Sequence, residues 1–354
     1  MARVKLGDVA REYKATCGDQ KEGLRVVGLE HLIPQQIILT LWDEGKENTF
    51  TKMFKKGQVL FGRRRAYLKK AAVAPFDGIC SGDITVIEAI PGKILPELLP
   101  FIIQNDTLFD FAVERSAGSL SPRVKWEHLK NFEFELPELD RQKELADILW
   151  ASERAKTAYR ELISNTDELV KSQFIEMFGD ITNGEYRWEA RAFDDVIADN
   201  TRFGTKIPTD DYLTNGTYPI IDQGQSFISG YVNSNEGLYT NCPAIIFGDH
   251  TRCFKYIDFP FFLGADGVKL LKLKTTDVNY RFMVSQLTLL PLANMGYNRH
   301  FRWLREFKLI IPPIALQDRY SSMVEQFDKS KFAAKQALEN LERTQKSLMN
   351  RYLG

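Results

Sequence analysis

Basic side chains gather in a few short stretches of this sequence. In GRRRAYLKK, the residues Arg63, Arg64, Arg65, Lys69 and Lys70 fall within eight positions. Lys and Arg bind phosphate groups, and Arg also forms paired hydrogen bonds with guanine. A solvated strand end is the alternative, but three consecutive Arg without nearby acids would repel one another. We therefore interpret this cluster as a candidate nucleic-acid contact.

Further polar loops could take part in the same kind of contact. The stretch RSAGSLSPRVKW contributes Arg115, Ser116, Ser119, Ser121, Arg123 and Lys125, and an ordinary loop explains it equally well. Later in the chain, FGDHTRCFK contributes His250, Thr251, Arg252 and Lys255, and MGYNRHFRW contributes Tyr297, Asn298, Arg299, His300 and Arg302. Asn, Arg and His all form hydrogen bonds with base edges, so MGYNRHFRW is the stronger candidate. Two weaker candidates, for which an ordinary loop is favoured, are TRFGTK with Arg202 and Lys206, and DQGQS with Gln223 and Gln225.

The sequence contains no clear motif of a methyltransferase, an ATP-driven motor or a nuclease. An amino-methylating enzyme needs an Asn/Asp-Pro-Pro-aromatic loop, whereas Pro312-Pro313 is flanked by Ile on both sides. No GxxxxGK[ST] loop indicates an ATP-driven motor. Asp258, Asp266 and Lys269 resemble a nuclease's acidic pair and lysine only loosely, because their spacing is poor. We therefore predict no active site in this chain.

The cysteines indicate neither a metal site nor a disulfide framework. Cys242, His250 and Cys253 lie close in sequence, but structural zinc normally takes four ligands with paired spacing. We predict no metal. The first residues lack the apolar core of a signal peptide, and no apolar run reaches the length of a membrane span. A cytoplasmic protein with reduced thiols and no membrane association is expected.

The overall charge gives no support to nucleic-acid binding. The 354 residues include 47 Lys plus Arg and 47 Asp plus Glu, so the formal net charge is zero. Nucleic-acid binders usually carry an excess of basic residues. Local clusters can still create a positive field where it is needed.

The chain contains an internal repeat. LKNFEFELPELDRQ, starting at Leu129, matches LREFKLIIPPIALQ, starting at Leu304, with every equivalent pair 175 positions apart. The same offset continues to the end, where Gly179 matches Gly354. Upstream the offset grows to 187, because LGDVA at 6–10 matches FDDVI at 193–197. This pattern predicts two variable modules, each followed by a helix of constant length.

The elements of each module predict a mixed α/β (α+β) fold. QVLFG, KKAAVAP and DITVIEA in the first half, and AIIFG, FKYIDFPFF and KLLKL in the second, are short β-prone runs separated by Gly, Pro and Asp. LPELLPFIIQNDTLFDFAVERS and VNYRFMVSQLTLLPLAN are expected to be the helices that cover them. The expected segments are a first module at 1–141, a helix at 142–178, a linker and second module at 179–316, and a helix at 317–354.

The two long helices carry apolar residues at intervals of three and four, which is typical of a coiled coil. At about 1.5 Å per residue each would be roughly 55 Å long. Helices of equal length and similar stripe are expected to pair with each other. An antiparallel pairing would relate the two modules by an approximate two-fold axis.

The duplicated junction, strand–Pro–spacer–Gln–helix, resembles that of the Type I restriction-modification specificity (S) subunits. VLFGRRRAYLKKAAVAPFDGICSGDITVI and IIFGDHTRCFKYIDFPFFLGADGVKLLKL resemble target-recognition-domain cores of that family. The resemblance covers essentially the whole chain. It implies a non-catalytic subunit in which each target-recognition domain reads one half of a bipartite double-stranded DNA target.

The same resemblance implies partners and a role for the helices. These would set the spacing between half-sites and dock two DNA methyltransferase subunits, through which restriction/translocase subunits join. S-adenosylmethionine, ATP and Mg are expected in those partners, with no cofactor in this chain. Two alternatives stay open: a coiled-coil protein-interaction scaffold, which would not shift a DNA duplex, and a specificity subunit of another methylation-based defence system.

Overall fold

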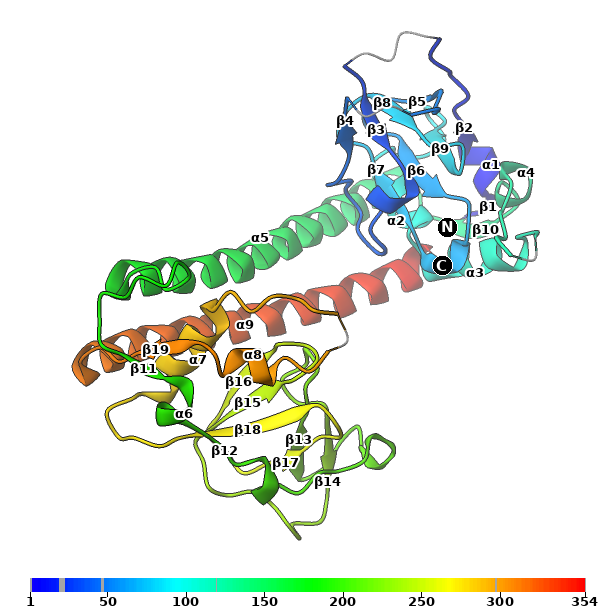
Figure 1. The fold of residues 1–354 in the computed structure, drawn as a ribbon. Helices are drawn as coiled ribbons and strands as arrows, with labels where there is room; N and C mark the ends of the chain where they lie inside the picture. The colour runs from blue at the N-terminus through cyan, green and yellow to red at the C-terminus, as the bar shows by residue number, and fades with distance from the viewer. Residues whose placement is uncertain (1, 19–22, 46–47, 119, 297, 354) are drawn as a thin grey trace. The chain divides into compact units, whose positions relative to one another are not determined.

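The computed structural model describes residues 2–18, 23–45, 48–118, 120–296 and 298–353, which group into two compact units (Figure 1). Unit 1 comprises Met1–Glu161 together with Lys335–Gly354, and unit 2 comprises Leu162–Ala334. Each long helix is therefore divided between the units, whereas the sequence analysis treated the helices as separate segments. In the described part of the chain, no helix combines the length and apolarity needed to cross a membrane.

Unit 1 is built on two four-stranded sheets and a short strand pair. The strand pair joins β1 (Ala2–Lys5) to β10 (Glu133–Leu136). The antiparallel sheet has the order β2 (Ala10–Glu12), β9 (Ile84–Ala89), β6 (Val59–Gly62) and β7 (Ala71–Val73). The second sheet has the order β4 (Asp43–Glu44), β3 (Arg25–Val27), β8 (Gly78–Cys80) and β5 (Lys52–Phe54), with β3 and β8 parallel. The helices are α1 (Leu6–Val9), α2 (Leu99–Ile103), α3 (Asp106–Glu114), α4 (Trp126–Leu129) and the first part of α5 (Leu139–Phe178).

Unit 2 repeats this topology. Its strand pair joins β11 (Ala190–Ala192) to β19 (Lys308–Ile310), and its four-stranded sheet has the order β12 (Ile197–Asp199), β18 (Val268–Leu273), β15 (Ala244–Gly248) and β16 (Phe254–Ile257). The remaining sheet has the order β14 (Gly230–Val232), β13 (Tyr218–Ile221) and β17 (Phe262–Leu263), with a single bridge between Tyr239 and Phe261 beside it. The helices are α6 (Phe193–Val196), α7 (Tyr280–Leu289), α8 (Phe301–Leu304), the first part of α9 (Ile314–Leu353) and the last part of α5. The repeat predicted from the sequence is therefore a repeat of structure.

Single-turn 3-10 helices connect these elements. They are η1 (Leu29–His31), η2 (Ala66–Leu68), η3 (Thr201–Phe203) and η4 (Thr209–Asp211). The segment expected to form one covering helix in unit 1 is broken into α2 and α3. Buried Asn105 causes the break, because its side chain accepts a hydrogen bond from the Thr107 N–H and caps α3.

A buried glutamine fixes the start of each long helix. The Gln142 amide donates to the Pro137 carbonyl at 2.8 Å and accepts from the Leu95 N–H at 2.9 Å. Its repeat equivalent, Gln317, donates to the Pro312 carbonyl at 2.6 Å and accepts from the Asn279 N–H at 2.8 Å. Both α5 and α9 have 40 residues and begin three residues before the expected start, so the glutamine lies in the first turn. The Pro–Gln spacing is thus a clamp between the last strand and its helix.

Within each unit the two long helices run antiparallel. In unit 1, Arg160 of α5 pairs with Glu342 of α9 at 2.8 Å. In unit 2, Asp167 of α5 pairs with Lys331, and the Tyr320 hydroxyl donates to the Val170 carbonyl at 3.3 Å. As numbers rise along α5 they fall along α9, which confirms the expected antiparallel pairing.

Candidate nucleic-acid interface

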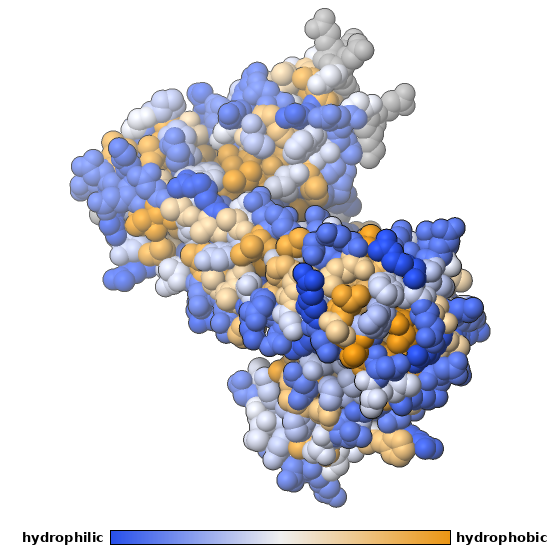
Figure 2. Space-filling view, turned by 90° about the vertical axis from the view of Figure 1, so that its left-hand side faces the viewer, coloured by the Kyte–Doolittle hydropathy of each residue, from blue (hydrophilic) through white to orange (hydrophobic). Residues whose placement is uncertain are grey.

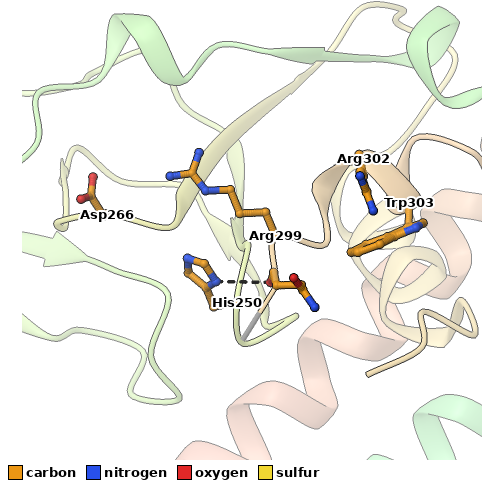
Figure 3. A pocket seen from close by; sticks show the side chains of 6 residues that line it. His250, Asp266, Arg299, Arg302 and Trp303 are labelled. Atoms are coloured by element: carbon orange, nitrogen blue, oxygen red, sulfur yellow. Dashed lines mark hydrogen bonds between the residues drawn. The ribbon is translucent and has the colours of Figure 1, made fainter. Parts of the chain in front are cut away.

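In unit 2, the loops that follow β15 and α7 border an open cavity of about 560 Å³ (Figure 3). His250 comes from the turn after β15, and Asp266 from the turn before β18. The other lining residues are Asn298 and Arg299 from the α7–α8 loop, and Arg302 and Trp303 on α8. Four of these six residues were predicted from two separate stretches of sequence, and the fold brings those stretches together.

One hydrogen bond joins the two sides of this cavity. The His250 ring nitrogen Nδ1 lies 3.3 Å from the Asn298 carbonyl oxygen (Figure 3). A carbonyl only accepts, so Nδ1 carries the hydrogen in this contact. The Arg302 guanidinium lies 4.1 Å from the centre of the Trp303 ring, within cation–π range. Trp303 thereby restricts where that guanidinium points.

The two arginines of the cavity have no acidic partners among the described residues. Both are exposed, and among the described residues neither Arg299 nor Arg302 has a carboxylate within 4.0 Å of its guanidinium. Guanidinium groups of this kind suit phosphate oxygens or the acceptor edge of guanine. The cavity can therefore bind an anionic or acceptor-rich group.

His300 was expected to contact nucleic acid, and the structure corrects this. The side chain is fully buried, with Nδ1 2.8 Å from the Asp249 carbonyl and Nε2 accepting from the Met295 N–H at 3.2 Å. Both ring nitrogens are occupied inside the protein. His300 instead holds the α7–α8 loop against the turn after β15. Tyr297, the neighbouring candidate, lies outside the described residues.

The other candidates of unit 2 mostly hold loops together. The Arg252 guanidinium donates to the Leu292 carbonyl at 2.9 Å, and the Thr251 hydroxyl donates to the Gln223 carbonyl at 2.5 Å. The Gln223 side chain accepts from the His250 N–H and donates to the Asp266 carbonyl. These residues shape the cavity rather than offer free groups to it.

Four further polar residues of unit 2 have partners or lie at its surface. Lys206 pairs with Asp266 at 3.5 Å, and Arg202 lies over the ring of Phe203. Gln225 accepts from the Cys253 thiol at 3.4 Å. Lys255 is buried and donates to the carbonyls of residues 222 and 226. Lys255 is therefore a structural cation.

In unit 1, the basic cluster has acidic partners that are distant in sequence. Asp83 accepts from Arg123 in a paired contact at 2.6 and 3.1 Å, and lies 3.7 Å from Arg64. Lys69 pairs with Asp106 at 2.5 Å. The premise that this cluster has no nearby acids was wrong, because β6–β9 pairing places Asp83 beside residue 63. The hydrogen bond from Arg123 holds the pKa of Asp83 below its usual value.

The remaining basic candidates of unit 1 divide by exposure. Lys70 is partly buried and donates to the Leu29 carbonyl at 2.7 Å, so its ammonium is engaged inside the unit. Arg63 has a buried Nε, whereas Arg65, Arg115 and Lys125 are exposed. Ser121 accepts from the Arg64 Nε at 2.6 Å, and Ser116 donates to the Ala112 carbonyl. Ser119 lies outside the described residues.

Among the described residues, three potential metal ligands converge at one place, and the cysteines are not part of it. Cys242, His250 and Cys253 do not form a group with converging ligand atoms among the described residues, and all four cysteines are free thiols. Glu30, His31 and Asp43 do bring ligand atoms within 4.8 Å of one another. However, His31 Nδ1 accepts from the Gly28 N–H at 2.9 Å, so Nε2 carries the hydrogen in the neutral ring. That arrangement is a hydrogen-bonding histidine rather than a prepared ligand.

A family model matches the chain twice, once in each half. The model is Methylase_S, described as the Type I restriction modification DNA specificity domain, and it covers residues 4–165 and 186–343. The chain belongs to this family. The resemblance drawn from the duplicated Pro–Gln junctions is thereby confirmed, as are the mixed α/β fold class and the internal repeat.

Two curated members of the specificity-subunit group are similar to parts of the chain, both from Escherichia coli. The specificity subunit of the Type I restriction enzyme EcoR124I/EcoR124II is 34% identical over 67 residues, which cover 18% of this chain and 17% of that subunit. The specificity subunit of EcoDI is 25% identical over 153 residues, which cover 42% of this chain and 33% of that subunit. The matched segments thus span a third or less of these relatives.

Solved structures of the same group share the fold. The S subunit of a Type I restriction-modification system from M. genitalium has a TM-score of 0.65 at 13% identity, covering 98% of this chain and 94% of that one. A chain from a study of complex assembly and conformational transition in the type I R-M system has a TM-score of 0.52 at 18% identity, covering 99% and 97%. The similarity in fold therefore extends over both unit 1 and unit 2.

Three residues that shape the candidate sites of the two units were not predicted from the sequence. Trp303 was passed over, although it lies in the selected stretch MGYNRHFRW, and Asp266 was weighed only as a nuclease acid. A signal existed for Trp303, since an aromatic residue next to Arg often packs on its guanidinium. Asp83 had no comparable signal, because its partners become visible only once the strands are paired.

Proposed function

We propose that this chain is a DNA-recognition subunit, each unit reading one half of a bipartite double-stranded target. The observation that carries the proposal is the repetition itself. Two units of the same topology, each matched by the DNA specificity family, present different polar loops at equivalent positions. Two readers with different loops are expected to prefer different bases.

In unit 2, the cavity around Arg299 and Arg302 is the proposed DNA contact. The arginines would bind phosphate oxygens or a guanine edge, and Asn298 would hydrogen bond to a neighbouring base. Trp303 limits the conformations of Arg302, which lowers the entropy cost of binding DNA. This local arrangement explains how a chain with no net charge could bind a polyanion.

In unit 1, the proposed contact is the edge formed by Arg64, Arg65 and Arg123. Asp83 holds Arg123 through a two-point contact, so the guanidinium is fixed before DNA arrives. The remaining N–H groups of Arg123 and the exposed Arg65 would bind the backbone. Of the sequence candidates, Arg115 and Lys125 are exposed nearby in the chain and would supply phosphate contacts.

The long helices are proposed to set the spacing between half-sites and to dock partners. On the face drawn in Figure 2, apolar patches lie among hydrophilic side chains. Along α5, Leu162 and Leu169 are exposed seven positions apart on one helix face, and Leu139 and Ile148 are exposed nearer its start. Apolar helix faces of this kind suit partner helices. Two DNA methyltransferase subunits, and through them restriction/translocase subunits, are the partners we propose.

The chemistry is assigned to those partners. S-adenosylmethionine, ATP and Mg would bind to those partners, and this chain would recognise the DNA target sequence for a cytoplasmic complex. A specificity subunit for another methylation-based defence system would use the same geometry. A coiled-coil interaction scaffold is the competing function, favoured only by the zero net charge.

The test combines the full chain with the methyltransferase subunit of its own host. The complex is incubated with a duplex library carrying two randomised segments separated by a variable spacer, and methylated molecules are sequenced. We expect one bipartite sequence with a fixed spacer. A complex that assembles yet neither shifts a duplex at low salt nor methylates any selected sequence would leave the scaffold function standing.

A further inference from the structure

The loops that precede α4 and α8 have the same length. In unit 1, residues 115–125 join α3 to α4, and in unit 2, residues 290–300 join α7 to α8. The sixth residue of each loop is a large apolar one, Leu120 in the first and Met295 in the second. Leu120 is 90% exposed and Met295 is 50% exposed. The 175-residue offset of the repeat also relates these two positions.

In unit 1, hydrogen bonds fix the base of this loop. Ala117 and Arg123 exchange backbone hydrogen bonds at 3.1 and 2.9 Å, which leaves Leu120 near the middle of the tip. The Arg65 N–H donates to the Pro122 carbonyl at 2.8 Å. The Arg64 Nε donates to the hydroxyl of Ser121 at 2.6 Å. Leu120 is thus presented on a supported turn beside the basic cluster.

In unit 2, a different set of contacts supports the equivalent position. The Met295 N–H donates to Nε2 of the buried His300, and the Met295 carbonyl accepts from the Asn298 side chain. The His300 N–H donates to the Asp249 carbonyl at 2.9 Å. Met295 is therefore held next to Asn298, one of the residues that line the arginine cavity.

Turn geometry does not explain an apolar side chain at Leu120, and Met295 stays half exposed although it lines a surface pocket with Leu292 and Trp303. Turns favour Gly, Asn, Asp and Ser, and neither side chain belongs to the buried clusters. One exposed Leu would be ordinary. Two large apolar residues at equivalent positions, in loops with otherwise different residues and different supports, indicate a shared use.

We propose that Leu120 and Met295 are the apolar base contacts of the two half-sites, each packing against the C5-methyl group of a thymine. The proposal rests on the proposed function, since it assumes that these loops face DNA. Thymine's methyl is the apolar group that a base pair presents in the major groove, beside the acceptors and donors that Arg and Asn read. Each unit would then combine polar and apolar readout in one loop.

The methylation library tests the assignment. Leu120→Ala should weaken the preference for a T·A pair at one position of one half-site by about fourfold, the value of burying one methyl group. Met295→Ala should do the same in the other half-site alone. Leu41→Ala and Leu213→Ala, which truncate exposed leucines outside these loops, should leave both half-sites unchanged. Thermal unfolding of Leu120→Ala should match the unsubstituted chain, because that side chain is 90% exposed, and the three variants at half-exposed positions should show similar, small shifts.

Deoxyuridine then probes the methyl group directly. Replacing the selected thymine by deoxyuridine should weaken binding of the unsubstituted complex about fourfold. The matching Ala variant should bind thymine and deoxyuridine duplexes equally, because the partner of the methyl group is gone. Such non-additivity is the signature of a direct contact.

Three results would overturn the inference while leaving the proposed function intact: a relaxed position that is a G·C pair, no relaxed position at all, or deoxyuridine sensitivity that persists in the Ala variant. An increase in the fluorescence of 2-aminopurine next to the site that requires Leu120 would also contradict the inference. It would indicate that Leu120 inserts between base steps instead of packing on a methyl group. A complex of the unsubstituted chain that selects no bipartite sequence would instead overturn the proposed function.

Discussion

Basic side chains at the candidate interfaces of the two units differ in their acidic partners. In unit 1, Asp83 lies between Arg64 and Arg123, and Asp106 pairs with Lys69. In unit 2, Arg299 and Arg302 line an open cavity without an ion pair among the described residues. The second residue of α4 is an acid, Glu127, whereas the second residue of α8 is Arg302. One fold therefore supports arginines held by an aspartate in one unit, beside the exposed Arg65, and arginines without ion pairs around a cavity in the other.

The ion pairs on the long helices α5 and α9 also differ between the two units, in how deeply they are buried. In unit 1, Glu153 and Lys156 form an ion pair at 2.6 Å with only 3% and 6% of their side chains exposed. Gln345 of α9 donates to that carboxylate at 3.4 Å. In unit 2, Asp167 of α5 pairs with Lys331 of α9 at the surface. Unit 1 thus contains a buried ion pair on its long helix, in addition to the exposed Arg160–Glu342 pair, whereas Asp167 of unit 2 is exposed.

The largest effect is expected from Glu153→Ala. It would leave the buried Lys156 ammonium without its carboxylate, which costs about 3–5 kcal/mol of the free energy of unfolding. Asp167→Ala, the exposed counterpart, should cost about 1 kcal/mol or less. Urea unfolding of the two variants measures the difference. If the paired replacement Glu153→Leu with Lys156→Met were as damaging as Glu153→Ala, weaker packing rather than an unpaired charge would be responsible.

The next effect concerns DNA binding. Arg299→Ala with Arg302→Ala should weaken binding of the assembled complex by about tenfold or more. The salt dependence should flatten by roughly 0.9 in slope for each phosphate that an arginine no longer neutralises. The control is Arg11→Ala with Glu88→Ala, which removes an ion pair of unit 1 outside the proposed DNA contacts. This control should change the salt slope little. Equal slopes for the two double variants would mean that Arg299 and Arg302 do not contact phosphates.

A smaller effect is expected at the junction glutamines. Gln142→Ala and Gln317→Ala each leave buried backbone groups without partners, at a cost of about 1–3 kcal/mol in unfolding free energy. Gln317 should be the more costly, because its amide also donates to the Asp277 carbonyl at 3.0 Å. Urea unfolding, followed by amide hydrogen exchange in each unit, tests the ranking. A greater destabilisation by Gln142→Ala would show that the two clamps are not equivalent.

The smallest effect should depend on pH. Because Arg123 holds the pKa of Asp83 below its usual value, the ionised carboxylate stabilises the folded state. That contribution is present above the unfolded pKa of about 3.9 and disappears as pH falls through the lower folded pKa. Asp83→Asn should therefore be slightly less stable than the unsubstituted chain at pH 6, with the gap closing below about pH 4. A gap that stays constant from about pH 7 to pH 3 would contradict the ion pair.

Local sequence patterns predicted the features that depend on near neighbours. The 175-residue offset predicted two equal helices and a repeated fold, since strand, Pro and Gln follow each other within a few residues. The burial of His300 could not be predicted from the stretch MGYNRHFRW. It depends on a hydrogen bond to the carbonyl of Asp249, which lies in another turn. The partners of Arg64 and Arg123 likewise depend on the register of β6 with β9. Positions that need long-range pairing were the ones mispredicted.

The division of α9 between the units bears on how the chain folds as it is synthesised. Met349 and Leu353 are part of the core of unit 1, and the Asn105 side chain donates to the Met349 carbonyl across 244 positions. Unit 1 therefore stays incomplete on the ribosome until all of unit 2 has been made. Contacts this distant in sequence slow folding, because a long loop must close before they contribute. Unit 2, whose residues are contiguous, can fold first. The last segment of α9 can then pack against the core of unit 1, which stays partly exposed until that step.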